Sequence, residues 1–271
     1  MTAKSLIDAG QLGPAVARLG EDLRARPADR TARTFLFELL CFSNDFDRAE
    51  RQLDVLGHQD GDLLGVQVFR SLLAAERTRS RLFDQGHRPR FVLAPPPAVE
   101  LHLEALDLVR QGHQIEAREA LDRAGTLQAP LQGTVGEAAY GEFRDADDIL
   151  APVLEVITSA GYFWVPWEHI QHVAVSTPRN LRDLLWMPAD LATFDGQLGQ
   201  VFLPNLYPGT GSHPDDRVRL GHTTVWRDHG AAIVRGAGTK IFLAGDETFT
   251  LPELGVVQFS PPPEPAMTPG S

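Results

Sequence analysis

The chain has 271 residues, with 25 Lys and Arg against 36 Asp and Glu, which gives a net charge of −11. A surface this acidic repels phosphate backbones and anionic lipids, so we expect neither a nucleic-acid nor a membrane partner. Apolar residues make up 43% and charged residues 23% of the chain, as in ordinary globular proteins.

Cysteine content and the chain ends indicate the compartment. The single cysteine, Cys41, excludes an intramolecular disulfide and a multi-cysteine metal site. Residues 1–10 lack the basic-then-apolar pattern of a signal peptide, and no run of about 18 apolar residues is present. We therefore expect a cytoplasmic protein. Residues 260–271 are rich in proline without apolar periodicity, which predicts a disordered tail.

The first half of the chain carries a helical repeat. Residues 5–26 and 31–56 place apolar side chains at three- and four-residue spacing. A turn residue, a small alanine and a large apolar residue recur in one 34-residue phase, which matches the helix–turn–helix unit of tetratricopeptide repeats. The three sets are Gly10, Ala15 and Leu19, then Asn44, Ala49 and Leu53, then Gly112, Ala117 and Leu121.

One register of this repeat is degenerate. Residues 65–90 keep a helical pattern without the signature, and three prolines within 91–99 predict an extended segment after it. The alternative is a plain helical bundle with coincidental spacing. We predict a tetratricopeptide-like all-helical domain over residues 1–130.

Shorter apolar runs separated by turn residues dominate the second half. We predict one helix over 148–159, because acidic residues precede an apolar run, and a short helix over 178–186. The predicted strands are Tyr162–Val165, His172–Val175, Gln200–Leu203, Arg217–Trp226, Ala232–Val234, Lys240–Ala244 and Val256–Phe259. The fold class is therefore α+β, with a smaller, mostly antiparallel α+β domain over 131–259.

Catalytic and metal-binding signals are weak. Asp145, Asp147 and Asp148 offer carboxylates for a divalent cation, but helix capping explains the same residues. His169 and His172 have a spacing that can chelate zinc on a helix, without an HExxH motif. We predict no catalytic residue, metal or cofactor, and a metal-dependent hydrolase built on residues 145–148 with either histidine stays as the alternative.

A binding groove is the stronger prediction. In stacked repeats the first helix of each unit lines a concave surface that receives a peptide or a helix. Such a groove suits an amphipathic, basic helix, unless the second half of the chain folds over it. Two tryptophans of an aromatic run also enter the candidate set, as core or as an exposed patch. The candidates are Thr34, Glu38, Cys41, His102, Leu106, Val109, Trp164 and Trp167.

Seven strings distributed along the chain carry a family resemblance: FLFELLCF (35–42), DFDRAERQLD (45–54), FRDADDILAPVLEV (143–156), YFWVPWEHI (162–170), PRNLRDLLWMPA (178–189), VFLPNLYPG (201–209) and RLGHTTVW (219–226). They resemble the ImpE/SciE/TagJ family, accessory proteins of the bacterial type VI secretion system. The resemblance covers about residues 5–259. It implies a non-enzymatic adaptor that binds the N-terminal helix of the small sheath subunit, TssB, and links the sheath to the AAA+ unfoldase ClpV. A purely structural partner of the assembly is a further alternative.

Overall fold

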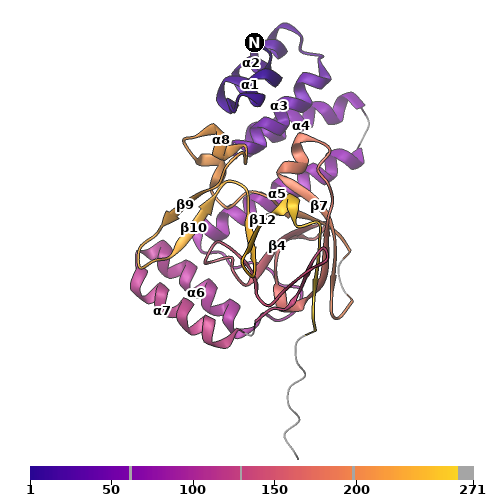
Figure 1. The fold of residues 1–271 in the computed structure, drawn as a ribbon. Coiled ribbons are helices and arrows are strands. Elements are labelled where there is room, and N and C mark those ends of the chain that lie inside the picture. The colour runs from indigo at the N-terminus through magenta and orange to yellow at the C-terminus, as the bar shows by residue number, and fades with distance from the viewer. Residues whose placement is uncertain (61–62, 129, 197–198, 262–271) are drawn as a thin grey trace, which may run out of the picture.

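The computed structural model describes residues 1–60, 63–128, 130–196 and 199–261 (Figure 1). Helices occupy the first part of the chain and antiparallel strands the second, so the fold is α+β as predicted. Most of the predicted tail, from residue 262 onward, lies outside the described residues. Among the described helices, none combines the length and apolarity that a bilayer crossing requires.

The first four helices form two hairpins, in which each helix packs against the next. Gly10 and Asn44 join the helices of these hairpins with positive φ angles of 71° and 54°, and the repeated Ala15 and Ala49 are 0% exposed. The predicted spacing therefore has its physical cause in close helix approach at each alanine. The helices are α1 (Ala3–Asp8), α2 (Leu12–Ala25), α3 (Arg30–Phe42) and α4 (Phe46–Asp60).

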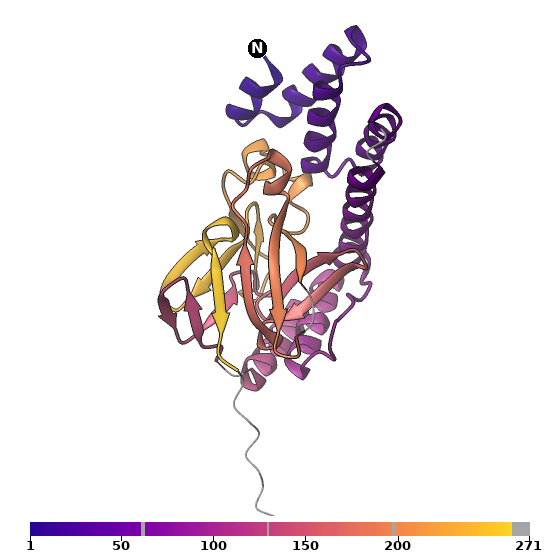
Figure 2. The same ribbon diagram turned by 90° about the vertical axis from the view of Figure 1, so that its right-hand side faces the viewer.

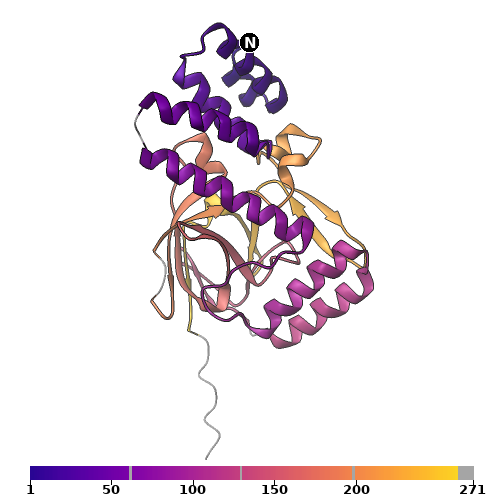
Figure 3. The same ribbon diagram turned by 180° about the vertical axis from the view of Figure 1, so that it is seen from behind.

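The next helix departs from a regular stack. Helix α5 (Leu63–Gln85) packs on α4 and then runs along the sheet, where it contacts strand β5. An extended segment leads to a third hairpin of α6 (Pro97–Gln111) and α7 (Gln114–Leu127). Figure 3 shows this hairpin at the opposite end of α5 from α1–α4. The three hairpins share a sequence phase, but they do not line one continuous groove.

The second part of the chain contains an eight-stranded antiparallel sheet in the order β2-β1-β13-β6-β7-β8-β4-β5. A three-stranded sheet, β12-β11-β3, and a β9–β10 ribbon complete it (Figure 2). The strands are β1 (Gly133–Val135), β2 (Ala138–Tyr140), β3 (Phe143–Asp145), β4 (Val153–Thr158), β5 (Gly161–Pro166), β6 (Ile170–Val175), β7 (Trp186–Thr193), β8 (Gln200–Pro204), β9 (Val225–Asp228), β10 (Val234–Ala237), β11 (Ile241–Ala244), β12 (Glu247–Thr250) and β13 (Val256–Phe259).

Three sequence predictions of local structure were wrong. The expected helix over 148–159 is strand β4, whose first five residues are all buried between β5 and β8. A strand covered on both faces reads as a continuous apolar run, which periodicity cannot distinguish from a buried helix. The expected helix over 178–186 is a single 3₁₀ turn, η2 (Leu181–Leu184), followed by β7. The expected strand over 217–226 begins with a short helix, α8 (Asp216–Arg219).

Two hydrophobic clusters hold these layers together. The first joins the helices to the outer face of the sheet and includes Leu106, Tyr162 and Trp164. The second fills the space between the sheets and includes Phe143 and Trp167. Within β5, Tyr162 and Trp164 belong to the first cluster and Val165 to the second, so neighbouring residues of this strand face opposite cores, as the two-residue period of a strand requires.

Candidate functional site

Residues of the second half cover the predicted groove on α3. Glu38 is 8% exposed and forms a 3.3 Å ion pair with Arg182 of η2, whose guanidinium lies over the Phe69 ring. Burial raises the pKa of Glu38, against the opposing effect of Arg182. Thr34 is half-buried and Cys41 is buried. The η2 turn therefore occupies the space that a partner helix would need.

The predicted face of α6 also points into the protein. His102 and Leu106 are 5% and 3% exposed, and Val109 is half-buried. The His102 imidazole lies against the backbone of Asp148 and Ile149, and burial lowers its pKa to about 4. This face of α6 is consequently part of the core.

Both candidate tryptophans are interior residues with 0% exposure. The Trp164 indole Nε1 donates to the Tyr162 hydroxyl at 2.6 Å. Trp167 packs edge-to-face on Phe143, with ring centroids 4.9 Å apart. Cys41, Leu106 and Trp164 belong to the first hydrophobic cluster, with Val109 packed against it, and Trp167 belongs to the second. The structure therefore places these candidates in the interior and does not gather the eight on one exposed surface.

The acidic cluster fixes loops instead of converging on a cation. Asp145 Oδ1 accepts from the backbone N–H of Asp147 at 2.9 Å and from the Tyr207 hydroxyl at 2.7 Å. Asp147 Oδ1 accepts from two following backbone N–H groups, and Asp148 Oδ2 accepts from the Val234 N–H. Within the described residues, no group of three or more His, Cys, Asp and Glu side chains is placed to hold a metal ion.

A buried ionic network joins α5 to the sheets, and we call its members Arg79, Glu155, Lys240 and Asp145 the junction network. Arg79 Nε and Nη2 donate to the two Glu155 oxygens at 2.6 and 2.8 Å. Lys240 Nζ lies 2.7 Å from Glu155 Oε2 and 3.5 Å from Asp145 Oδ2. All four side chains are almost fully buried.

The charges of the junction network set the protonation of its carboxylates. Burial alone would raise the pKa of Glu155, but Arg79 and Lys240 outweigh it and hold the pKa well below its usual range. Burial raises the pKa of Asp145 to about 6, because Lys240 offsets it less fully. The ion pairs of the junction network therefore hold α5 against the sheets. Single charges inside apolar runs, such as Glu155 in VLEVI, were the sequence signal that could have identified it.

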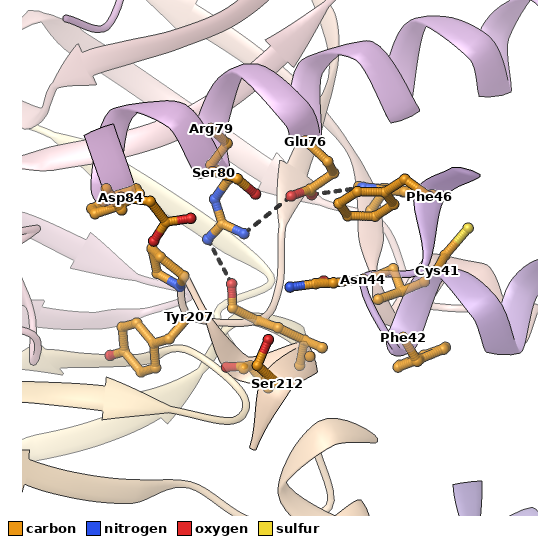
Figure 4. Close-up of a pocket in the computed structure, with 18 residues that line it drawn as sticks. Cys41, Phe42, Asn44, Phe46, Glu76, Arg79, Ser80, Asp84, Tyr207 and Ser212 are labelled. Atoms are coloured by element: carbon orange, nitrogen blue, oxygen red, sulfur yellow. Dashed lines mark hydrogen bonds and ion pairs between the residues drawn. The ribbon is translucent and has the colours of Figure 1, made fainter. Parts of the chain in front are cut away.

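Beside this network lies a pocket of about 220 Å³, which we call the junction pocket (Figure 4). The α3–α4 turn at Asn44, the α5 residues Glu76 and Asp84, and the loop 206–212 line it. Glu76 accepts from the Trp186 indole Nε1 at 2.9 Å and pairs with Arg79 at 3.4 Å. The volume is below that of most ligand sites, and two of its polar groups already hold α5 to the sheet domain.

No activated thiol faces the junction pocket. Burial raises the pKa of Cys41 well above its ordinary value, and the charges of Glu76 and Glu38 raise it further. The thiol form of cysteine is a poor nucleophile. Cys41 therefore acts as a small apolar side chain of the wall.

A larger and more open depression follows the outer face of α6, with a volume of about 800 Å³, and we call it the α6 groove. Helix α6 forms one wall and the extended segment before it forms the rim. Three carboxylates and one arginine line it together with leucines and prolines. Its residues are Arg88, Pro95, Pro97, Glu100, Leu101, Leu103, Glu104, Asp107, Leu108 and Gln111.

Comparison with known proteins places this architecture in context. The model of the ImpE family, described as ImpE protein, matches residues 137–258. The chain is 34% identical over 262 residues to the type VI secretion system accessory component TagJ of Pseudomonas aeruginosa, which covers 96% of this chain and 92% of the relative. A crystal structure of protein VPA1032 from Vibrio parahaemolyticus has 25% identity and a TM-score of 0.86, covering 95% of this chain and 97% of that one.

Proposed function

Because this chain belongs to the ImpE/SciE/TagJ family, we propose that it is a cytoplasmic, non-enzymatic adaptor of a type VI secretion system. The observation that carries the proposal is the similarity to the accessory component TagJ over 96% of the chain. The match includes both the helical part and the sheet-rich part, so the role is assigned to the whole protein and not to one module.

The proposed partners are the N-terminal helix of the small sheath subunit TssB and, through it, the ClpV unfoldase. An adaptor needs a surface that receives a helix and a rigid body that fixes its orientation. The first hydrophobic cluster and the junction network connect α5 to the sheets, and the second cluster fills the space between the sheets, so together they supply the rigid body. The −11 net charge favours a basic partner segment.

The non-enzymatic part of the proposal rests on how the titratable side chains are used. Asp145, Asp147 and Asp148 accept hydrogen bonds from backbone N–H groups, and Glu155 is paired with two cations. Catalytic acids and bases need access to a substrate in a plausible pose. Asp145, Asp147 and Glu155 are all 0% exposed, so they favour a structural role.

A binding titration tests the proposal. A fluorescent peptide of the first TssB helix is titrated with the full chain, and we expect saturable binding with Kd below about 100 µM, near −5.5 kcal/mol. A peptide of the same composition in scrambled order is the control. No saturation by the native peptide would overturn the adaptor role toward TssB.

A pull-down then separates adaptor from purely structural partner. ClpV is immobilised and offered TssB with and without this chain. An adaptor raises the TssB that ClpV retains, whereas a structural partner leaves it unchanged. The second result would remove the unfoldase link from the proposal.

A further inference from the structure

We propose that the connection between β6 and β7, residues 176–185, is an autoinhibitory lid, whose η2 turn has to leave α3 and α5 before a partner segment can dock on them. The inference rests on the proposed function for the partner that displaces the lid. In stacked helical repeats the first helix of each unit lines the binding surface, and α3 and α5 begin two successive registers of this repeat. The occupant of that surface here is a segment of the same chain.

The lid holds this surface with the chemistry of a bound amphipathic segment. Arg182 forms an ion pair with Glu38 of α3 at 3.3 Å, and its guanidinium carbon lies 5.3 Å from the centroid of the Phe69 ring on α5. Leu181 and Leu184, three residues apart, pack against the first hydrophobic cluster. Apolar anchors at this spacing, with a cation between them, are how an amphipathic helix binds a groove. A segment that replaces the lid has to supply the same groups.

The lid keeps its shape without help from α3. The Asp183 carboxylate accepts hydrogen bonds from the backbone N–H groups of Arg179 and Asn180 at 2.8 and 2.9 Å, which closes the turn on itself. These bonds lie within the connection, so they remain when the turn leaves the helices. The turn can therefore move as one unit.

The base of the lid is fixed to the sheet. The Ser176 N–H donates to the Pro188 carbonyl at 2.9 Å, and the Asn205 side-chain amide donates to the Leu184 carbonyl at 2.9 Å. Residues 177–183 are the part between these two attachments. Loop residues next to a fixed element are where hinge motions occur, so the turn swings about this base.

The closed and open positions of the lid are close in free energy. All four residues of η2 are half-buried, and the Arg182 side chain keeps 35% of its surface exposed. Beneath it the Glu38 side chain is only 10% exposed, and burial raises the pKa of this carboxyl despite Arg182. Removing a carboxylate from water costs about as much free energy as its ion pair returns. The lid is therefore held weakly enough for a competing segment to displace it.

Opening the lid uncovers a site for a cation between two helices. Phe69 packs edge-to-face on the buried Phe37, with ring centroids 5.2 Å apart, so its ring stays in place when Arg182 leaves. The uncovered surface then offers the Glu38 carboxylate for an ion pair and the Phe69 face for a cation–π contact. A planar guanidinium uses both groups at once, so the site selects arginine over lysine in the displacing segment.

The test titrates the TssB first-helix peptide with four forms of the full chain. Arg182→Ala removes both contacts of the lid arginine, and Glu38→Gln removes the carboxylate that the lid and the partner both use. Arg179→Ala is the matched control, because Arg179 is an exposed arginine of the same connection, three residues before Arg182. Circular dichroism and thermal melting confirm that every form is folded.

The affinities separate a lid from an ordinary packing contact. We expect Arg182→Ala to bind the peptide about 3- to 10-fold more tightly than the wild type, because a larger fraction of the protein is open before binding. Glu38→Gln frees the lid but weakens the docking surface, so it should bind at least 3-fold more weakly than Arg182→Ala. Arg179→Ala should change the affinity less than 2-fold.

Hydrogen exchange measured by mass spectrometry gives a second readout on the wild type. Peptide binding should raise the exchange of the backbone amides in residues 179–184, because the lid is released. If the peptide binds without raising this exchange, or if Arg182→Ala binds no more tightly than the wild type, the lid is overturned while the adaptor role stands. If no form binds the peptide, the adaptor role toward TssB fails and the lid is overturned with it.

Discussion

The junction network and the α6 groove use the same residue types in opposite ways. At the junction, the Arg79 and Glu155 side chains are 7% and 0% exposed, whereas Arg88 and Glu100 at the groove are 61% and 43% exposed. A buried charge must keep its partner, because water cannot replace it. An exposed pair is screened and can exchange. The buried pairs therefore fix how α5 lies on the sheets, whereas the exposed pairs contribute little to the stability of the fold.

Removing one carboxylate from each region gives the largest expected contrast. Glu155→Ala leaves Arg79 and Lys240 buried without their shared anion, and we expect a loss of about 4 kcal/mol in the free energy of unfolding. Glu104→Ala removes an exposed partner of Arg123, and we expect a change below about 0.5 kcal/mol. Urea denaturation of both variants measures the two values.

A double variant separates a lost interaction from a stranded charge. In Arg79→Met with Glu155→Met, the principal ion pair is replaced by apolar side chains of similar length. We expect this protein to be more stable than Glu155→Ala alone, because fewer buried charges lack a partner. If Glu155→Ala and Glu104→Ala lowered the free energy of unfolding equally, the junction network would not hold α5 to the sheets more strongly than an exposed ion pair does.

The same contrast explains what sequence could predict. The 34-residue phase identified the hairpin alanines correctly, because Ala15, Ala49 and Ala117 act within neighbouring helices and are all 0% exposed. Strand β4 was predicted as a helix, because its identity depends on pairing with β5 and β8. Nothing local to residues 153–158 records that pairing.

The candidate site failed to assemble for a related reason. Both sides of α6 carry leucines, so the apolar pattern does not tell which side of the helix the sheet domain will cover. The covering groups, such as the backbone near Asp148, come from much later in the chain. On α3 the covering residue is Arg182, 144 positions beyond Glu38. Burial by distant segments is a property of the fold and not of the repeat.

Protonation of His102, on the inner face of α6, provides a second test of how a buried charged group affects the stability of the protein. Burial lowers the pKa of His102 to about 4, whereas an unfolded histidine titrates near 6.5. Between these values the unfolded chain binds more protons, so stability falls as the pH drops from about 6.5 to 4, by about 3 kcal/mol in total. We expect His102→Gln to remove this slope in urea denaturation at several pH values.

Asp145 makes stability depend on pH in the opposite direction, so an Asp145 variant is the control for the His102 variant. Its folded pKa of about 6 exceeds the unfolded value near 3.9, so the folded state binds more protons and its stability falls as the pH rises from 4 to 6. The two contributions nearly cancel in the wild type over this window. Asp145→Asn should steepen the loss of stability on acidification, and identical profiles for both variants would contradict the assignment.

The smallest expected effect concerns the contact between the α3–α4 turn and the 206–212 loop at the junction pocket. A Cβ on Gly211 would lie 2.4 Å from Asn44 Cγ, so Gly211→Ala must displace the Asn44 side chain. We expect a loss of about 1–2 kcal/mol, because the crowding is confined to one short side chain. Gly125→Ala, at an exposed position of α7, is the matched control: its Cβ meets open space, and removing a helical glycine should stabilise the protein by about 0.5–1 kcal/mol. If Gly211→Ala instead stabilised the protein, the α3–α4 turn and the 206–212 loop would not be packed against each other. Helices α1–α4 would then be held to the sheet domain mainly through α5 and η2.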